Sequence, residues 1–432
     1  MKIVILSGGS GKRLWPLSNE IRAKQFIKIF KDNKSMLQRT YDNLSKMFNK
    51  DNIVIETSKM QESELKKQLG NDVDVSIEPV KRDTFPAVLL ACLYLRDVKK
   101  VSLDENIIIC PVDHYTDKKY FESIKKLDTI IESNKYNLNL MGITPKEANT
   151  KYGYIIPKDN NKVSEVLDFK EKPSLKEAKE LIKKNALLNV GIFGFKLKYI
   201  IDKAHEIINF DDYYDLFSKY DNLEKISFDK AISENEKNIG VLKFNGLWEY
   251  LGNWDSLTKI MEEKVVGKGF ISKSSKNVNI INETDLPIYS IGLKDVVISA
   301  SPDGILVSNK EESESIKDYL LDKDNTSNQG EKSFGKFKVI DVDKKSQTFK
   351  VELLKGNKMS YHSHKNRDEV WIVISGNGKV IVDGMEEIVT VGDVITMQRE
   401  TKHTIIAETN LKLIEVQLGE VDVNDKKKYD ME

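Results

Sequence analysis

The sequence is poor in cysteine, carries no excess charge and has no long apolar run. Its two cysteines, Cys92 and Cys110, stand in apolar segments without a spaced pattern, which argues against a disulfide framework and predicts buried free thiols in a reducing compartment. The formal net charge is zero, so neither a nucleic acid nor an anionic membrane is expected as a partner. No stretch approaches the ~18 apolar residues of a membrane span, and the run at residues 1–6 is too short for a signal peptide. We therefore expect a cytoplasmic protein.

A chain of 432 residues is too long for one ordinary domain, so two or three domains are expected. In residues 1–265, short apolar runs rich in β-branched residues alternate with amphipathic stretches. We expect strands at residues 3–6, 53–56, 73–77 and 107–110, and helices at 87–98 and 120–131. This alternation predicts an α/β domain of Rossmann type with a mixed, mostly parallel sheet. Ligands of such sheets bind beyond the carboxyl ends of the strands.

The pattern changes after residue 265. Residues 266–322 hold short β-type segments separated by Asn, Ser, Asp and Gly, with a helical stretch at 311–321, and they predict a small β-solenoid annex. Residues 323–333 are polar and are interpreted as a linker. In residues 334–432, alternating strands with glycine-rich turns predict a compact C-terminal β-barrel.

A glycine-rich loop follows the first predicted strand. Residues 8–11 read Gly-Gly-Ser-Gly, and two cations, Lys12 and Arg13, come directly after them. Glycines let the backbone pass close to a phosphate and aim N–H groups at it, while the cations neutralise its charge. The Gly-Lys-Ser/Thr ending of a Walker loop is absent, and so is the spacing of the dinucleotide loop. Taken alone, this loop predicts only that a phosphate binds there.

The residues that continue this loop are more specific. Leu14-Trp15-Pro16-Leu17-Ser18 and Lys24-Gln25-Phe26 resemble the opening of the mannose-1-phosphate guanylyltransferases. Further elements resemble motifs of that family and follow in the family's order: Glu78-Pro79, Arg82-Asp83-Thr84, Pro111-Val112-Asp113-His114, Tyr152-Gly153-Tyr154, Phe169-Lys170-Glu171-Lys172-Pro173, Asn189-Val190-Gly191 and Gly252-Asn253-Trp254. The resemblance covers the whole first domain and implies an enzyme that makes GDP-mannose and pyrophosphate from GTP and mannose-1-phosphate.

In nucleotidyl transfer, a sugar-phosphate oxygen attacks the α-phosphorus of the triphosphate and pyrophosphate leaves. Positioning and charge neutralisation carry such a reaction. We expect Arg13 and Lys24 to clamp the triphosphate, and Asp113, at the end of the fourth strand, to hold the Mg²⁺ cofactor. Glu78 is expected to accept N–H groups of guanine. The nucleotide-binding residues expected are Leu6, Gly8, Gly9, Gly11, Glu78 and Arg82, and the sugar-phosphate-binding residues expected are Gly153, Glu171, Lys172 and Asn189.

The sequence departs from the family at several positions near the sugar and the metal. Tyr250 stands where the family has an aspartate that helps to hold the catalytic metal, and Leu188 and Val190 replace a tryptophan and a serine. Either Glu249 takes the place of the missing carboxylate, or Asp113 and the phosphates hold Mg²⁺. Two alternatives therefore stay open: a nucleotidyltransferase for another sugar-1-phosphate, such as a manno-heptose phosphate, and a protein with weakened catalysis that binds a nucleotide-sugar.

Three of the five histidines fall in one C-terminal pattern, His362-x-His364-x4-Glu369 followed by His403. Residues two apart in a strand face the same side, so His362 and His364 can both point into a barrel. Glu369 and His403 are expected on neighbouring strands, where they complete a set suited to Zn²⁺, Fe²⁺ or Mn²⁺, with Zn²⁺ as our first choice. This spacing resembles the two cupin motifs.

A guanylyltransferase followed by a cupin is the arrangement of the bifunctional enzymes that also isomerise mannose-6-phosphate. Segments similar to theirs are Phe334-Gly335-Lys336-Phe337, Arg367-Asp368-Glu369 with Trp371, and Ile414-Glu415-Val416-Gln417-Leu418-Gly419. The resemblance implies mannose-6-phosphate as the substrate of the cupin, where a metal polarises the carbonyl and a base moves the C2 proton. Thr404 stands where these enzymes often have an arginine, which would weaken phosphate binding. The sequence leaves a homo-oligomer open.

Overall fold

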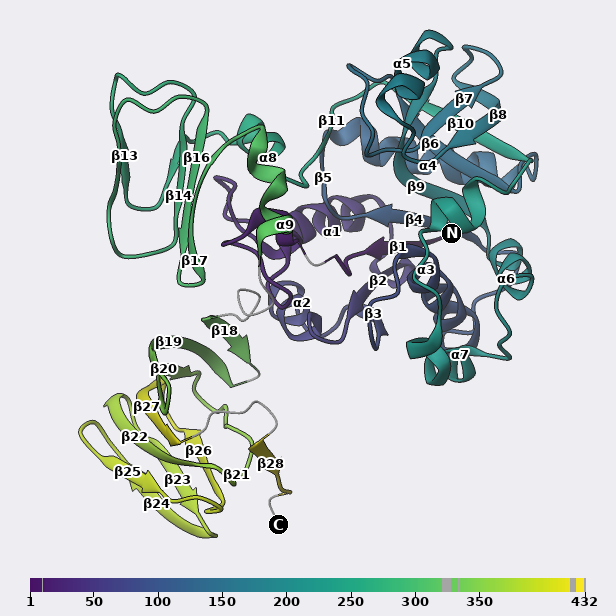
Figure 1. The fold of residues 1–432 in the computed structure, drawn as a ribbon. Helices are drawn as coiled ribbons and strands as arrows, with labels where there is room; N and C mark the ends of the chain where they lie inside the picture. The colour runs from purple at the N-terminus through teal and green to yellow at the C-terminus, as the bar shows by residue number, and fades with distance from the viewer. Residues whose placement is uncertain (10, 321–327, 333, 420–424, 431–432) are drawn as a thin grey trace. The chain divides into compact units, whose positions relative to one another are not determined.

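The computed structural model describes residues 1–9, 11–320, 328–332, 334–419 and 425–430. The chain divides into two compact units (Figure 1). Unit 1 comprises Met1–Leu14 and Arg22–Glu263, and unit 2 comprises Trp15–Ile21 and Lys264–Glu432. Within the described residues, no helix has the length and apolar character needed to cross a membrane.

The main sheet of unit 1 has nine strands in the order β3-β2-β1-β4-β9-β6-β10-β8-β7. Their bounds are β1 Lys2–Leu6, β2 Ile53–Ser58, β3 Asp74–Glu78, β4 Asn106–Pro111, β6 Leu138–Ile143, β7 Tyr154–Pro157, β8 Val163–Lys170, β9 Leu187–Lys196 and β10 Ile239–Phe244. Strands β8 and β9 run against all the others. The prediction of a mixed, mostly parallel sheet is therefore confirmed, and β1 to β4 are the four strands expected from the sequence.

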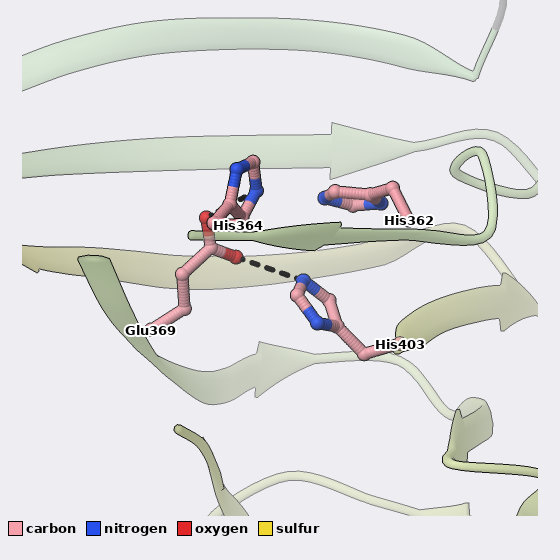
Figure 2. Close-up of side chains that lie close together, drawn as sticks. All are labelled: His362, His364, Glu369 and His403. Carbon is pink, nitrogen blue, oxygen red and sulfur yellow. Dashed lines mark hydrogen bonds and ion pairs between the residues drawn. The ribbon is translucent and has the colours of Figure 1, made fainter. Parts of the chain in front are cut away.

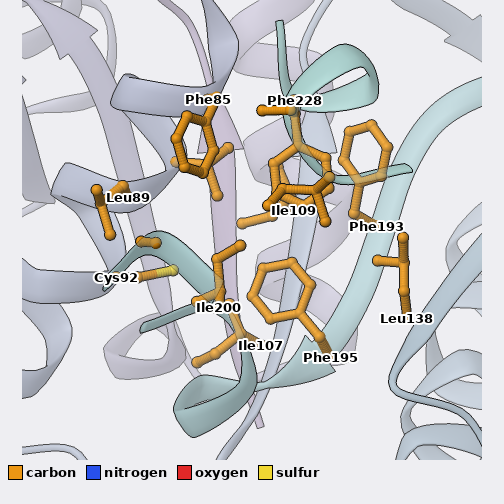
Figure 3. Close-up of a cluster of buried hydrophobic side chains, with 14 of the residues drawn as sticks. Phe85, Leu89, Cys92, Ile107, Ile109, Leu138, Phe193, Phe195, Ile200 and Phe228 are labelled. Atoms are coloured by element: carbon orange, nitrogen blue, oxygen red, sulfur yellow. The ribbon is translucent and has the colours of Figure 1, made fainter. Parts of the chain in front are cut away.

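Helices cover both faces of this sheet because consecutive strand residues point to opposite sides. Ile3 and Ile5 of β1 lie in one buried cluster with Leu37, and Val4 lies in the other with Val88. Figure 3 shows the second cluster, in which Phe85 and its neighbours pack against the strands. The helices of the first face are α1 Met36–Met47, α2 Glu62–Leu69 and α4 Lys118–Glu132, and those of the second are α3 Thr84–Leu93, α6 Leu197–His205 and α7 Tyr213–Lys219.

Smaller elements complete unit 1. Helices α5 (Leu175–Lys183) and α8 (Trp254–Ile260) lie outside the two sets above. Short 3₁₀ or π turns occur at Lys12–Leu14, Lys24–Phe26, Lys50–Asn52, Tyr94–Val98, Tyr220–Asn222 and Asp229–Ser233. The π turn at Tyr94–Val98 continues α3, so the helix expected at 87–98 is confirmed, and α4 contains the one expected at 120–131. Strands β5 (His114–Thr116) and β11 (Trp248–Tyr250) form a two-stranded ribbon directly after β4.

The first part of unit 2 is a small β-solenoid. Its strands are β12 Val265–Val266, β13 Gly269–Ile271, β14 Asn279–Asn282, β15 Ile288–Ser290, β16 Val296–Ser301 and β17 Gly304–Asn309. Strands β12, β14 and β16 pair in parallel, as successive coils do, and Ile280 and Ile298 lie in the apolar interior. The helix expected at 311–321 is shorter, because the serine-rich start forms a 3₁₀ turn (Glu312–Ser315) before α9 (Ile316–Tyr319). Leu321 lies outside the described residues.

Residues 15–21 belong to unit 2, although they follow the glycine-rich loop of unit 1. The Ser301 hydroxyl donates to the Pro16 carbonyl (2.7 Å), and the Asn19 amide donates to Asp303 (3.0 Å). Gly304 faces the Trp15 ring so closely that a Cβ there would lie 2.4 Å from it. These contacts explain why this stretch groups with the solenoid, which no local pattern of the sequence indicates.

The second part of unit 2 is a β-barrel of two sheets. The six-stranded sheet comprises β18 Gln329–Lys332, β19 Gly335–Asp343, β20 Ser346–Leu353, β22 Arg367–Ser375, β25 Val394–Met397 and β27 Leu411–Gly419, and the five-stranded sheet β21 His362–His364, β23 Gly378–Val382, β24 Met385–Val389, β26 His403–Ala407 and β28 Lys426–Lys428. The predicted barrel is confirmed. Within the expected linker, residues 323–327 and 333 lie outside the described part, and Gln329–Lys332 is a strand because it pairs with β19.

Candidate functional site

The glycine-rich loop leaves the end of β1, and glycine is required at one of its positions. Gly11 has a positive φ of 69°, and a Cβ there would lie 2.6 Å from the backbone nitrogen of Lys24. A Cβ on Gly8 would lie 2.9 Å from Oε1 of Glu78. Gln25 and Gln61 hold the loop by donating to the carbonyls of Ser7 (2.6 Å) and Gly9 (3.0 Å). The backbone therefore passes close to the carboxyl ends of the strands.

A cavity of about 380 Å³ opens beside this loop at the carboxyl ends of β1 to β4. Six of the residues predicted from the sequence line it: Leu6, Gly8, Gly9, Lys24, Glu78 and Asp113. The other predicted residues of the first domain are not among its lining: Gly11, Arg13, Arg82, Gly153, Glu171, Lys172 and Asn189. Ligand binding beyond these strand ends is what the topology favours.

Lys24 and Asp113 form a buried ion pair in this cavity. Burial opposes the charge on both groups, yet the pKa of Asp113 is lowered, because Lys24 and His114 outweigh burial. The pKa of Lys24 is raised for the matching reason, with Asp113 as the main partner. His114 lies 3.5 Å from Asp113, and burial lowers the pKa of its ring to about 4. A neutral, structural histidine beside Asp113 is the interpretation that this geometry favours.

Tyr250 stands within the same charge cluster. Its hydroxyl lies 3.3 Å from Nζ of Lys24 and 3.5 Å from Nη1 of Arg13, and Lys24 also sits 4.7 Å from the ring centroid. Tyr250 pairs with His114 across the β5–β11 ribbon. Glu249, the adjacent residue, is ion-paired with Lys146 at 2.5 Å. Because consecutive strand residues face opposite sides, Glu249 does not share the side of Tyr250 that faces Lys24.

The nucleotide side holds a carboxylate that the sequence analysis missed. Glu78 is 3% exposed and accepts from the Tyr220 hydroxyl at 3.2 Å. Glu56, at the end of the apolar run Ile53-Val54-Ile55, is 1% exposed and lines the same cavity. A charged residue that continues a buried strand was the available signal. Arg82 points elsewhere, because its guanidinium donates to the backbone carbonyls of Tyr220 and Asp221.

The predicted sugar-phosphate residues lie around the start of β9. Asn189 donates its backbone N–H to the carbonyl of Gly153 at 2.9 Å, and Lys172 pairs with Glu171 at 2.7 Å. Oε2 of Glu171 is buried and has no hydrogen-bond partner among the residues that the structure describes. The Asn189 side chain donates to Asp229 (2.9 Å), a cavity residue that the sequence analysis also missed and whose pKa burial and Glu171 raise to about 7. The sequence signal that could have revealed Asp229 is an acidic residue placed among apolar residues that are buried, Phe228 and Ala231.

The four predicted cupin ligands come together at one buried point (Figure 2). One ligand atom of each of His362, His364, Glu369 and His403 lies within 4.8 Å of the others. Oε1 of Glu369 lies 3.0 Å from Nε2 of His364, and Oε2 of Glu369 lies 3.2 Å from Nε2 of His403. The expectation that Glu369 and His403 occupy neighbouring strands is wrong: His403 lies on β26, which pairs with β21, whereas Glu369 lies on β22 of the other sheet. Ligands reach the centre from both sheets because the barrel interior lies between them.

Neighbouring groups orient these ligands. Nδ1 of His362 lies 2.6 Å from the carbonyl oxygen of Ser360, and Nδ1 of His403 lies 2.9 Å from that of Thr401. A carbonyl only accepts, so both Nδ1 atoms carry a proton, and Nε2 is the nitrogen of each ring that remains to bind a metal. Three imidazoles and one carboxylate, all buried, fit a divalent transition metal. Within the described part of the chain, this is the one such group of three or more ligand side chains.

Comparisons with known proteins agree with this architecture. The sequence matches the nucleotidyl transferase family over residues 2–265 and the mannose-6-phosphate isomerase C-terminal family over residues 322–429. It is 30% identical to the mannose-1-phosphate guanylyltransferase RfbM of Salmonella typhimurium, over 97% of this chain and 95% of that protein. It is 27% identical to the alginate biosynthesis protein AlgA of Pseudomonas aeruginosa, again over 97% and 95%.

A solved structure shares the fold of the larger part of the chain. The crystal structure of a Thermus thermophilus protein described as a mannose-1-phosphate geranyltransferase superposes with a TM-score of 0.62 at 24% identity, over 74% of this chain and 97% of that one. The family matches and the near full-length relatives cover both parts of the chain. The chain therefore belongs to the mannose-1-phosphate guanylyltransferase family of nucleotidyltransferase enzymes that carry a mannose-6-phosphate isomerase-type C-terminal domain.

Proposed function

We propose that the first domain transfers a guanylyl group from GTP to mannose-1-phosphate with the help of Mg²⁺, releasing GDP-mannose and pyrophosphate. The observation that carries this proposal is the cavity of about 380 Å³ where the glycine-rich loop, Lys24, Glu78 and Asp113 meet. Backbone N–H groups and two cations suit a triphosphate, and a carboxylate suits the N–H edge of guanine. The cations thus match the triphosphate end of GTP, and the carboxylate matches its guanine end.

In this mechanism the chain positions its substrates and neutralises charge. Lys24 and Arg13, which both contact Tyr250, bind the triphosphate and stabilise the charge that builds up as the α-phosphorus is attacked. A phosphate oxygen of mannose-1-phosphate forms the new P–O bond, and the bond to the β-phosphate oxygen breaks. Asp113 and the phosphates would hold Mg²⁺, which would supply charge neutralisation for the leaving pyrophosphate. Lys172 binds the sugar phosphate as a point charge, and Gly153, Glu171 and Asn189 meet sugar hydroxyls.

We further propose that the cupin isomerises mannose-6-phosphate. The metal, Zn²⁺ as first choice, would be held by His362, His364, Glu369 and His403 and would polarise the carbonyl of the open-chain sugar. Such an isomerase would supply mannose-6-phosphate, whose phosphate another enzyme must move from O6 to O1 before the transferase can use it. The domain bounds that we propose are residues 1–265 for the nucleotidyltransferase, 266–322 for the solenoid annex with its helix, 323–333 for the linker and 334–432 for the cupin. The buried free thiols Cys92 and Cys110 support a cytoplasmic location.

One incubation series tests the transferase. Purified protein is mixed with Mg²⁺, mannose-1-phosphate and each nucleoside triphosphate in turn, and released pyrophosphate is measured. Release with GTP alone is the expected result. Release only when a manno-heptose-1-phosphate replaces the mannose phosphate would move the proposal to that sugar. No release with any pair, together with tight binding of GDP-mannose, would reject catalysis in favour of a nucleotide-sugar-binding protein.

A further inference from the structure

Two buried glutamates face the same point beneath the glycine-rich loop. A Cβ placed on Gly8 would lie 2.9 Å from Oε1 of Glu78 and 3.4 Å from Oε2 of Glu56. Glu56 lies on β2 and Glu78 at the end of β3, where Ser58 pairs with Glu78. Residues two apart on a strand share a face, so Glu56, Ser58 and Glu78 all project toward the cavity side. Both carboxylates line the cavity.

Glu56 occupies a position where the fold favours an apolar side chain. It is two residues beyond Val54, which packs in the buried cluster under α3. Among the described residues, Oε1 of Glu56 has no hydrogen-bond partner although the residue is 1% exposed. Burying an unpartnered carboxyl group costs free energy. A ligand in the cavity that hydrogen-bonds to this oxygen would offset that cost.

The two glutamates have different surroundings. Glu78 accepts from the Tyr220 hydroxyl at 3.2 Å and from the backbone N–H of Arg82, and the Lys81 charge lies nearby, opposed by Asp83. Burial still raises the pKa of Glu78 to about 7. Burial, and then the charge of Glu78, raise the pKa of Glu56 well above its ordinary value. Glu56 is therefore the member of the pair that keeps a proton, and Glu78 is the one that ionises first.

We propose that Glu56 and Glu78 share one proton and read the base of the nucleotide together, with the Glu78 carboxylate accepting from N1–H and N2–H of guanine and the Glu56 carboxylic acid donating to O6. This inference rests on the proposed function and adds Glu56 to it as a specificity-determining residue. A carboxylate beside a carboxylic acid offers two acceptors and one donor. Guanine offers two donors and one acceptor on the same edge.

Other bases leave part of this pair unmatched. Adenine presents one N–H and one ring nitrogen, so Glu78 would lose one of the two base N–H donors that guanine offers, and a ring nitrogen would replace one of them. Hypoxanthine, the base of ITP, keeps O6 and N1–H but lacks the 2-amino group. Comparing ITP with GTP therefore measures the contact of Glu78 with N2–H alone. A site whose buried polar groups lose their partners rejects the analogue strongly. The pair therefore predicts a preference for GTP over ITP, and for ITP over ATP.

Pyrophosphate release with GTP, ITP and ATP tests the pair, in wild type and in Glu78→Gln, Glu56→Gln and Glu56→Leu. We expect wild type to favour GTP over ITP by at least about tenfold in kcat/KM. Glu78→Gln should lose that preference, because an amide nitrogen then faces an N–H group. Glu56→Gln should keep it, since its amide still donates to O6, whereas Glu56→Leu should lower kcat/KM for both GTP and ITP about tenfold. Glu165→Gln, on the exposed side of β8, is the matched control.

The pH dependence tests the shared proton without relying on the leucine variant. Raising the pH removes the proton from Glu56, leaves two carboxylates and turns the O6 donor into an acceptor. Affinity for GTP in wild type should therefore fall as the pH rises through the range in which Glu56 loses its proton, whereas Glu56→Gln, which has no such proton to lose, should not show this fall. Equal GTP-to-ITP ratios in all variants, or parallel pH profiles, would overturn the inference while pyrophosphate release continues. No release with GTP in wild type would instead reject the proposed function.

Discussion

The two sites of this chain are assembled in different ways. The cupin ligands His362, His364, Glu369 and His403 converge until their ligand atoms lie within 4.8 Å of one another. The transferase groups come from segments as distant as Arg13 and Tyr250, and the sheet and its loops gather them. The cupin centre thus collects its ligands around one point, whereas the transferase site is a cavity that substrates must fill.

The two sites also differ in the charge that they offer to a cation. The cupin set has one carboxylate and three imidazoles and contains no lysine or arginine among the four ligands, which suits a divalent cation held by the protein alone. In the transferase site, the negative charge of Asp113 is already matched by Lys24. In the proposed function, Mg²⁺ there would depend on the phosphates that arrive with the substrate. The proposal therefore makes the cupin metal resident and brings the transferase metal in with the nucleotide.

The largest expected effect is the loss of the cupin metal. Replacing His364 and His403 by Ala together removes two of the four ligands, and we expect stoichiometric divalent metal in the purified wild type to be lost in the double variant. Elemental analysis measures it. The control is His205→Ala, an exposed histidine of unit 1. Full isomerase activity in a metal-free wild type would contradict the assigned site, and a fall in guanylyltransferase activity in the double variant would break the separation of the two sites.

Removing the cation beside Asp113 should have the next largest effect. Lys24→Met keeps the length of the side chain but removes the charge that faces the triphosphate, so kcat for pyrophosphate release should fall about 10²- to 10³-fold. Lys28→Met, at an exposed position nearby, should be close to wild type. Retained activity in Lys24→Met would show that Arg13 and Mg²⁺ suffice, and metal content of the cupin should be the same in all three proteins.

Lys172→Ala should separate the two substrates of the transferase. The Lys172 side chain lies beside Glu171 and is not among the residues that line the cavity next to the glycine-rich loop. We expect the KM for mannose-1-phosphate to rise about 10- to 100-fold, because a charge-assisted contact to phosphate is lost, while the KM for GTP changes little. Steady-state kinetics with each substrate varied in turn gives both values, with the exposed Lys170→Ala as control. Equal changes in both KM values would reject a role on the sugar side.

Tyr250→Phe should have the smallest effect. It removes one hydroxyl at 3.3 and 3.5 Å from Lys24 and Arg13 but keeps the ring under Lys24. A drop of about 2- to 10-fold in kcat/KM is expected, and the control is the exposed Tyr214→Phe. Tyr250→Asp sharpens the comparison: a second carboxylate should lower the Mg²⁺ concentration needed for half-maximal rate. An unchanged Mg²⁺ requirement would show that this position does not reach the metal.

Much of the fold follows from local patterns. The strands β1 to β4 and the helices α3 and α4 lie close to their predicted bounds, because alternating buried runs and amphipathic stretches are local signals. The grouping of residues 15–21 with unit 2 was not predictable, since it depends on contacts with Ser301 and Asp303 far along the chain. The strand at Gln329–Lys332 was likewise missed, because its pairing with β19 is a tertiary property and its composition is that of a linker.

The sequence by itself determined which chemical groups the chain carries and in what order: the glycine-rich loop, the cations after it, and the histidines of the cupin. Tertiary structure decided which of them meet. It brought Glu56 beside Glu78 and Asp229 beside Asn189, placed Tyr250 against Lys24, turned Arg82 toward backbone carbonyls, and drew the cupin ligands from two sheets. The reason is that side-chain direction in a strand is local, with a period of two, whereas strand order in a sheet depends on burial across the whole domain.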